Sequence, residues 1–327
     1  MKVLTMEKEA HQLNSFIYRY NPDLILLDVS YIKKNHNTVQ ETIIKYNIPV
    51  IVLSSRSVHD TAKTVFAITN GASDFILIDQ LDERNNQHEA IKKINYVVSS
   101  RPLKKQPKQV DEVNTSYKSQ YSPKKTKELT NENNLPISFA HIVAIGTSTG
   151  GPKALQSILR KFPKNFPAPI VIVQHMPAGF TKSLAKRLDD ICQISVKEAT
   201  NNEKLQQGTA YIAPGDYHMI INESYETIIF TDDARDGHRP SVNLLFESLA
   251  KLRHINKIAV ILTGMGKDGA TGVMKMKKED YQTVVIIESE ETAIVHGMPS
   301  ATLKTGYVTE VARLDEIGET IIKYTRK

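Results

Sequence analysis

The stretch Ile145-Gly146-Thr147-Ser148-Thr149-Gly150-Gly151 follows an apolar run and precedes an amphipathic segment that begins with Pro152. Proline directly after a glycine-rich turn is typical of the first turn of a helix, so the stretch predicts a strand, a tight loop and a helix. The same order recurs along residues 138–327, which indicates a doubly wound α/β domain built on a parallel sheet. Ligands of such sheets bind beyond the carboxyl ends of the strands.

Hydrophobic periodicity places further elements around this stretch. Strands are expected in the C-terminal part at residues 142–145, 170–174, 210–213, 219–221, 228–230, 258–262 and 283–287. Helices are expected there at residues 152–161, 181–189, 242–252, 268–278 and 314–324. Residues 1–100 also alternate, with strands expected at 24–29, 49–54 and 75–78 and helices at 37–46 and 59–70. Both parts therefore predict α/β domains.

Residues 101–137 differ in composition and predict a flexible basic linker between domains 1–100 and 138–327. They hold four prolines and eight basic against four acidic residues, so most of the net charge of +6 lies here. A nucleic-acid binder concentrates positive charge on a folded face, so nucleic acid is not an expected partner. Cys192 is the single cysteine, and no apolar run approaches the roughly 18 residues of a membrane span. These features predict a cytoplasmic protein that is not inserted in a membrane.

Three of the expected strand ends carry reactive side chains. Ser148 lies in a G-x-S-x-G spacing, which suits an exposed nucleophile and equally a phosphate-binding loop or a plain turn. His175 follows the strand at 170–174, where it is either a general base or a structural histidine. Asp268 lies before an expected helix, where it either orients a histidine or caps the helix. A Ser/His/Asp triad explains all three strand ends together, so we favour it.

A dinucleotide-binding loop is the rival interpretation. Gly264, Gly266 and Gly269 give the spacing G-x-G-x-x-G after a strand, and Glu288 ends the next strand. This fingerprint would place the carboxylate of Asp268 beside a pyrophosphate, and it leaves Ser148 unexplained. The triad is therefore the preferred hypothesis.

At these residues the C-terminal part resembles the CheB family of chemotaxis protein-glutamate methylesterases and glutamine deamidases. The matching stretches, in family order, are Gly146–Gly151, Gln174-His175-Met176-Pro177, Ile212-Ala213-Pro214-Gly215-Asp216, Arg239-Pro240-Ser241-Val242, Leu262–Gly269 and His296-Gly297-Met298-Pro299. The resemblance implies that Ser148 is the nucleophile, His175 the general acid–base and Asp268 its orienting carboxylate. It also places Thr149 and Met265 beside the reacting carbonyl, where their backbone N–H groups are candidates for an oxyanion hole. No cofactor is expected for catalysis. The implied substrates are methyl-accepting chemotaxis receptors, with a chemotaxis histidine kinase as a second candidate partner.

Residues 1–100 resemble a response-regulator receiver domain, a flavodoxin-like fold. The resemblance makes Asp28 the candidate phosphate acceptor and Val52-Leu53-Ser54-Ser55 the strand with the switch hydroxyl, with Mg²⁺ required only if Asp28 is phosphorylated. Ile78 stands where the family has a lysine. Residues 1–5 match the receiver's second strand, so the resemblance implies that its first strand and acidic pair are missing. A degenerate receiver is therefore favoured, and a truncated or misassigned start is the other explanation. A non-catalytic adaptor that binds receptors through the same fold is the alternative function.

Overall fold

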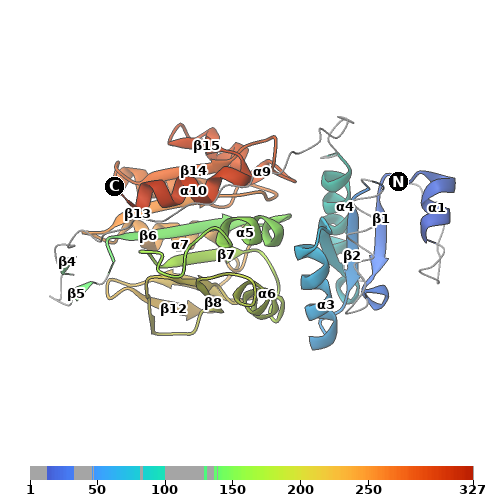
Figure 1. Ribbon diagram of the computed structural model, residues 1–327, viewed down its shortest axis with the longest axis horizontal. Helices are drawn as coiled ribbons and strands as arrows, with labels where there is room; N and C mark the ends of the chain where they lie inside the picture. The colour runs from blue at the N-terminus through green and yellow to red at the C-terminus, as the bar shows by residue number, and fades with distance from the viewer. Residues whose placement is uncertain are drawn as a thin grey trace, which may run out of the picture.

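The computed structural model describes residues 13–32, 46, 48–81, 84–99, 129–130, 136–137 and 139–326. Figure 1 shows an N-terminal unit, coloured blue, beside a larger C-terminal unit coloured green through red. Each unit has a parallel sheet with helices packed against it, which confirms the predicted α/β fold class.

The N-terminal unit contains a parallel sheet in the order β1-β2-β3. Its strands are β1 (Ile25–Asp28), β2 (Val50–Ser54) and β3 (Asp74–Leu77). Its helices are α1 (Leu13–Tyr20), α3 (Val58–Thr69) and α4 (Arg84–Ser99), with 3-10 turns at Val29–Tyr31 and Ile78–Gln80. The three expected strands are found within a residue of their predicted bounds. The expected helix at 37–46, apart from Tyr46, and the expected strand at 1–5 lie outside the described residues.

Alternation along the strands of this unit sends apolar side chains to two faces. Ile51 and Ile76 pack with Ile94 and Val97 of α4 on one face. Residues of α3 and the side chain of Phe75 belong to the core on the other face. Polar residues dominate α4, so its periodicity alone did not predict a helix.

The C-terminal unit is built on seven parallel strands in the order β15-β14-β13-β6-β7-β10-β8. They are β6 (His141–Thr147), β7 (Ile170–Gln174), β8 (Ser195–Glu198), β10 (Thr209–Ile212), β13 (Asn256–Ile261), β14 (Val284–Glu288) and β15 (Glu310–Ala312). The central strands are buried on both faces, which explains why they read as continuous apolar runs. This agrees with the predicted doubly wound sheet.

Helices cover both faces of this sheet. They are α5 (Gly151–Leu159), α6 (Phe180–Asp189), α7 (Val242–Ala250), α8 (Ala270–Glu279), α9 (Gly297–Leu303) and α10 (Leu314–Thr325). The core that contains Ile145 also takes residues from α5, α6 and α10, whereas the core that contains Ala144 takes residues from α7 and α8. A smaller antiparallel sheet, β11-β12-β9, packs against α7. Its strands are β9 (Glu203–Lys204), β11 (His218–Ile221) and β12 (Glu226–Phe230).

Several short elements were not expected from the sequence. They are the strands β8, β9 and β15 and the helix α9, together with a two-stranded pairing of β4 (Leu129–Thr130) with β5 (Pro136–Ile137). The last pair is the described part of the expected linker at 101–137. The expected helix at 268–278 begins later, at Ala270, because its N-cap Gly269 takes a positive φ of 98°.

The two units touch through α3, which packs against α5 and α6. The rings of Phe75 and Phe180 stack with centroids 4.6 Å apart. Arg187 lies over the ring of Phe66, and Arg56 forms an ion pair with Asp216 at 3.7 Å. The N-terminal unit, called the receiver-like unit below, therefore contacts α5 and α6, the helices that follow Ser148 and His175 in the chain.

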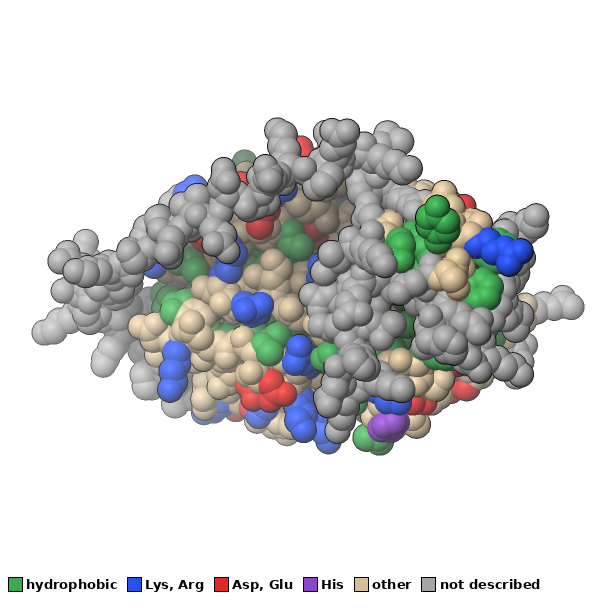
Figure 2. All heavy atoms as spheres, turned by 45° about the vertical axis from the view of Figure 1, so that its right-hand side comes forward, with side chains coloured by type: hydrophobic (Ala, Val, Ile, Leu, Met, Phe, Trp, Pro, Cys, Tyr) green, Lys and Arg blue, Asp and Glu red, His purple; other side chains and the backbone are tan. Residues whose placement is uncertain are grey.

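On the face shown in Figure 2, lysine and arginine side chains are interspersed with acidic ones over the described surface. Such mixing does not create a large field of one sign. Among the described residues, no helix is both long and apolar enough to cross a membrane.

Candidate active site

The candidate site lies where β13, β6 and β7 end. The chain begins this sheet with β6, adds β7 on one side and later returns with β13 on the other side. The strand order therefore reverses beside β6, and a crevice forms where the loops diverge at such a switch point. Ser148 follows β6, His175 follows β7, and Asp268 lies in the loop after β13. Three residues that are far apart in the sequence thus share one edge of the sheet.

The structure brings His175 and Asp268 into direct contact. The Nε2 atom of His175 lies 2.9 Å from Oδ2 of Asp268. An ionised carboxylate only accepts hydrogen bonds, so Nε2 carries the proton and the Nδ1 atom of a neutral ring keeps its lone pair. Nδ1 is buried and has no partner in the described structure. The imidazole is therefore held in a tautomer that can accept a hydroxyl proton.

Asp268 is fixed by the start of α7. Its carboxylate accepts backbone N–H groups of Val242 at 2.7 Å and Asn243 at 2.9 Å, and also the hydroxyl of Ser241 at 3.2 Å. Burial opposes ionisation, but the hydrogen bond and charge of His175 and these N–H groups outweigh it and hold the pKa of Asp268 below 3.8. Asp268 thus binds the first turn of α7, whose N-cap is Ser241, whereas the sequence suggested a cap of α8.

The loop that carries Ser148 is held on three sides. The N–H of Ser148 donates to the carbonyl of Thr263 at 3.1 Å, and its carbonyl accepts from Gly151 at 2.8 Å and from Nε2 of Gln174 at 3.0 Å. Gly264 lies so close that a Cβ there would be 2.8 Å from the Cβ of Ser148. The loop therefore leaves the Ser148 side chain half-buried at the start of α5, where the helix dipole favours negative charge.

The two candidate oxyanion residues flank this loop. Thr149 is buried and follows Ser148 directly, while Met265 is half-buried in the turn between Gly264 and Gly266. The carbonyl of Thr149 accepts the hydroxyl of Thr263, which ties one loop to the other. The structure thus places both residues on the loops that carry Ser148 and Asp268.

Sequence reasoning missed His238. Its ring stacks on that of His175, with centroids 4.1 Å apart and planes 5° apart. Burial, and then repulsion from His175, lower the pKa of His238 to about 4. A neutral ring is thus held against the candidate base. The position of His238, just before the matching stretch Arg239-Pro240-Ser241-Val242, was the available signal.

The position of Glu288 argues against the dinucleotide-binding hypothesis. This carboxyl is fully buried and accepts the N–H of Thr263 at 2.8 Å. Burial raises its pKa to about 7. A ribose hydroxyl would need this group at the surface of the crevice, so the geometry argues against nucleotide binding here.

In the receiver-like unit, Asp28 ends β1, Ser54 ends β2 and Ile78 follows β3. The Oδ1 atom of Asp28 accepts the N–H of Ser30 at 2.8 Å, and the Ser54 hydroxyl pairs with Thr64 at 2.6 Å. Mg²⁺ prefers several oxygen ligands. No group of three or more His, Cys, Asp or Glu side chains that could hold a metal ion occurs among the described residues.

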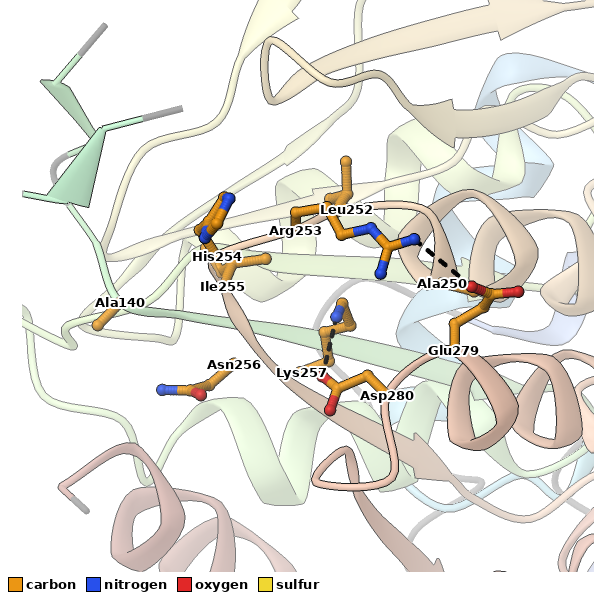
Figure 3. A pocket seen from close by; sticks show the side chains of 10 residues that line it. All are labelled: Ala140, Ala250, Leu252, Arg253, His254, Ile255, Asn256, Lys257, Glu279 and Asp280. Atoms are coloured by element: carbon orange, nitrogen blue, oxygen red, sulfur yellow. Dashed lines mark hydrogen bonds and ion pairs between the residues drawn. The ribbon is translucent and has the colours of Figure 1, made fainter. Parts of the chain in front are cut away.

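A cavity lies at the opposite edge of the sheet, where β6 and β13 begin. Figure 3 shows this cavity of about 450 Å³, with Lys257 paired to Asp280 and Arg253 paired to Glu279. Each of these two cations is paired with a carboxylate, and the cavity lies beyond the amino ends of the strands. It is therefore separate from the candidate active site.

Comparisons with known proteins show which family this chain belongs to. A family model described as CheB methylesterase matches residues 143–321. A protein-glutamate methylesterase/protein-glutamine glutaminase of Oceanobacillus iheyensis is 43% identical over 99% of this chain and 91% of its own. One from Bacillus subtilis is 35% identical over 100% of this chain and 92% of its own. The crystal structure of the Thermotoga maritima CheB methylesterase catalytic domain aligns with a TM-score of 0.54 at 45% identity, covering 57% of this chain and 98% of that one. The chain belongs to the CheB methylesterase family.

Proposed function

We propose that this protein hydrolyses glutamate methyl esters on methyl-accepting chemotaxis receptors and deamidates receptor glutamines. The observation that carries the proposal is the His175–Asp268 contact of 2.9 Å, which leaves Nδ1 of His175 without a hydrogen-bond partner in the described structure, at the strand end next to Ser148. The names of the relatives from O. iheyensis and B. subtilis support the same reaction.

In the proposed reaction, the Ser148 hydroxyl oxygen attacks the ester carbonyl while Nδ1 of His175 takes its proton. The resulting imidazolium is stabilised by Asp268. The carbonyl reforms, the C–O bond to the methoxy group breaks, and methanol leaves with the proton from His175. Water then attacks the acyl-enzyme by the same route and frees the glutamate. A glutamine amide passes through the same steps, with ammonia as the leaving group.

The developing oxyanion needs donors fixed before the reaction begins. We assign this role to the backbone N–H groups of Thr149 and Met265. Both lie on loops that are bound to each other through Thr263, so they need little rearrangement when charge develops.

The test is methanol release from methylated chemoreceptor membranes by the full chain and by Ser148→Ala. Loss of a triad nucleophile lowers kcat by about 10⁶-fold in a well-studied hydrolase. Ser248→Ala is the matched control, because Ser248 is a buried serine of α7 whose hydroxyl bonds to Leu245 and Ile221. If the wild-type chain binds receptors but releases no methanol, the adaptor function replaces this proposal.

We further propose that the receiver-like unit acts without aspartyl phosphorylation. Ile78, at a position where the receiver family has a lysine, supports the proposal. Incubation with acetyl phosphate and Mg²⁺ is expected to leave Asp28 unmodified. An acid-labile phosphoryl group that disappears in Asp28→Ala would contradict it.

A further inference from the structure

Thr263 lies at the centre of the contacts that join the Ser148 loop to the Asp268 loop. It follows β13 and is almost fully buried, with an exposed fraction of 1%. Its carbonyl accepts the N–H of Ser148 at 3.1 Å and the hydroxyl of Thr147 at 2.8 Å. Its own hydroxyl donates to the carbonyl of Thr149 at 2.9 Å. A single residue therefore bonds to all three residues from 147 to 149.

Two further bonds fix Thr263 itself. Its hydroxyl accepts the N–H of Val295 at 2.9 Å, and its N–H donates to Oε2 of Glu288 at 2.8 Å. Glu288 is fully buried at the end of β14, and its Oε1 atom has no hydrogen-bond partner in the described structure. A buried carboxyl with an unpartnered oxygen is costly. The N–H of Thr263 donates to its other oxygen, and a hydrogen bond with the Thr292 side chain also favours its ionised form.

We propose that Thr263 and Glu288 are positioning residues that set the nucleophile loop against the loop of Met265 and Asp268. This inference rests on the proposed methylesterase function. Neither side chain touches the reacting atoms in the proposed reaction. Both act through Ser148, whose backbone N–H is held by Thr263, and through Thr149, whose carbonyl is held by the Thr263 hydroxyl.

Displacing a reacting group by about 1 Å can cost about 100-fold in rate. The two loops come from strands that are more than 100 residues apart in the chain, so local chain geometry does not fix their spacing. The ladder between β6 and β13 sets the spacing as far as Gly146 and Leu262. Beyond it, Thr263 supplies the hydrogen bonds across to residues 147–149, together with the close approach of Gly264.

The experiment compares Thr263→Val with Thr263→Ser in the full chain. Valine keeps the shape but removes the hydroxyl, whereas serine keeps the hydroxyl. We expect Thr263→Val to lower kcat by about 10- to 100-fold with KM changed less than about twofold, and Thr263→Ser to restore kcat to within about threefold. The readouts are methanol release from methylated receptor membranes and the rate at which phenylmethylsulfonyl fluoride labels Ser148.

Thr227→Val is the matched control. Thr227 is also fully buried, and its hydroxyl also makes two backbone bonds, to Thr200 and from Glu203, but it lies in the small sheet on β12. We expect it to lower Tm without changing kcat. If Thr263→Val keeps the wild-type kcat, or loses no more than Thr227→Val, the proposal is wrong. It is equally wrong if Thr263→Ser is as slow as Thr263→Val.

A second pair of variants covers the case in which Thr263→Val does not fold. Glu288→Gln keeps an oxygen acceptor for the N–H of Thr263, and Glu288→Met removes it at similar volume. We expect the glutamine variant to match the wild type in kcat and in the rate of Ser148 labelling. We expect the methionine variant to be about tenfold lower in both quantities. Equal kcat for the two variants would overturn the proposal. Wild type and Ser148→Ala run alongside, so an inactive wild type marks failure of the proposed function instead.

Discussion

Replacing Asp268 by asparagine tests the central contact of the candidate site. The carboxylate accepts five donors: Nε2 of His175 and N–H of Val242 at Oδ2, and the Ser241 hydroxyl with the N–H groups of Asn243 and Gly269 at Oδ1. In either orientation, the asparagine NH₂ group faces at least two of these donors. With the NH₂ group at the Oδ2 position it faces only two donors, and His175 can accommodate it by moving its proton to Nδ1. That tautomer can no longer accept the Ser148 proton.

The expected magnitudes follow from this geometry. The wrong tautomer lowers kcat by about 10⁴-fold in a serine hydrolase with this arrangement. Each buried group left without a partner costs about 1–3 kcal/mol, so we expect a loss of about 2–5 kcal/mol in the free energy of unfolding. A domain with about 10 kcal/mol of stability, the middle of the usual range, remains folded after such a loss.

The assay is methanol release from methylated receptor membranes, with urea denaturation of the same preparations. Asp280→Asn is the matched control, because Asp280 pairs with the nearly buried Lys257 at 3.0 Å at the opposite edge of the sheet. We expect it to cost stability while leaving kcat unchanged. If Asp268→Asn remains folded and keeps kcat within tenfold of the wild type, the assignment of Asp268 as the residue that orients His175 is refuted.

Acid denaturation gives a second readout for Asp268. Its pKa in the folded protein is below the ordinary 3.8. The ionised form is therefore bound more favourably in the folded chain, and this stabilisation is present above the unfolded value and lost as the pH falls through the folded pKa. We expect Asp268→Asn to lack this loss below pH 3.8, and an unchanged acid limb would contradict the inferred ionisation.

Three further predictions concern other parts of the molecule. The pKa of His238 falls from 6.5 to about 4 on folding, so the unfolded chain takes up the proton first and the free energy of unfolding declines as the pH falls from 6.5 to 4. Urea denaturation across this range is expected to show a shallower decline for His238→Gln than for the wild type, and an identical decline would contradict the shift. Phe75→Ala removes the stack on Phe180 and is expected to speed proteolytic release of an intact 138–327 fragment, whereas simultaneous loss of both units would argue against a separable catalytic domain. NAD and NADP are expected to leave Tm unchanged because Glu288 is buried, and a saturable rise in Tm would revive the nucleotide-binding hypothesis.

The strands of the central sheet could be predicted because they are buried on both faces and therefore form uninterrupted apolar runs. The strand β15 has three residues with one buried, and α4 is mostly polar, so neither carries a periodic signal. Their conformations follow from pairing with β14 and from packing against Ile51 and Ile76. The conformation of such elements depends on tertiary contacts that the local sequence does not predict.

The sequence by itself determined the α/β class, the loop that presents Ser148 and the family resemblance, because these depend on local spacing of glycines, apolar runs and short motifs. It did not decide the roles of His175 and Asp268 when each was considered alone, because each also has an ordinary structural explanation at the end of a strand. The tertiary structure decided that they touch, that Asp268 also binds the start of α7, and that His238 stacks on His175. It also brought Thr263 onto the Ser148 loop from 114 residues away. The physical reason is that strand order sets which loops are neighbours at the sheet edge, and strand order is a property of the assembled sheet and not of any segment within it.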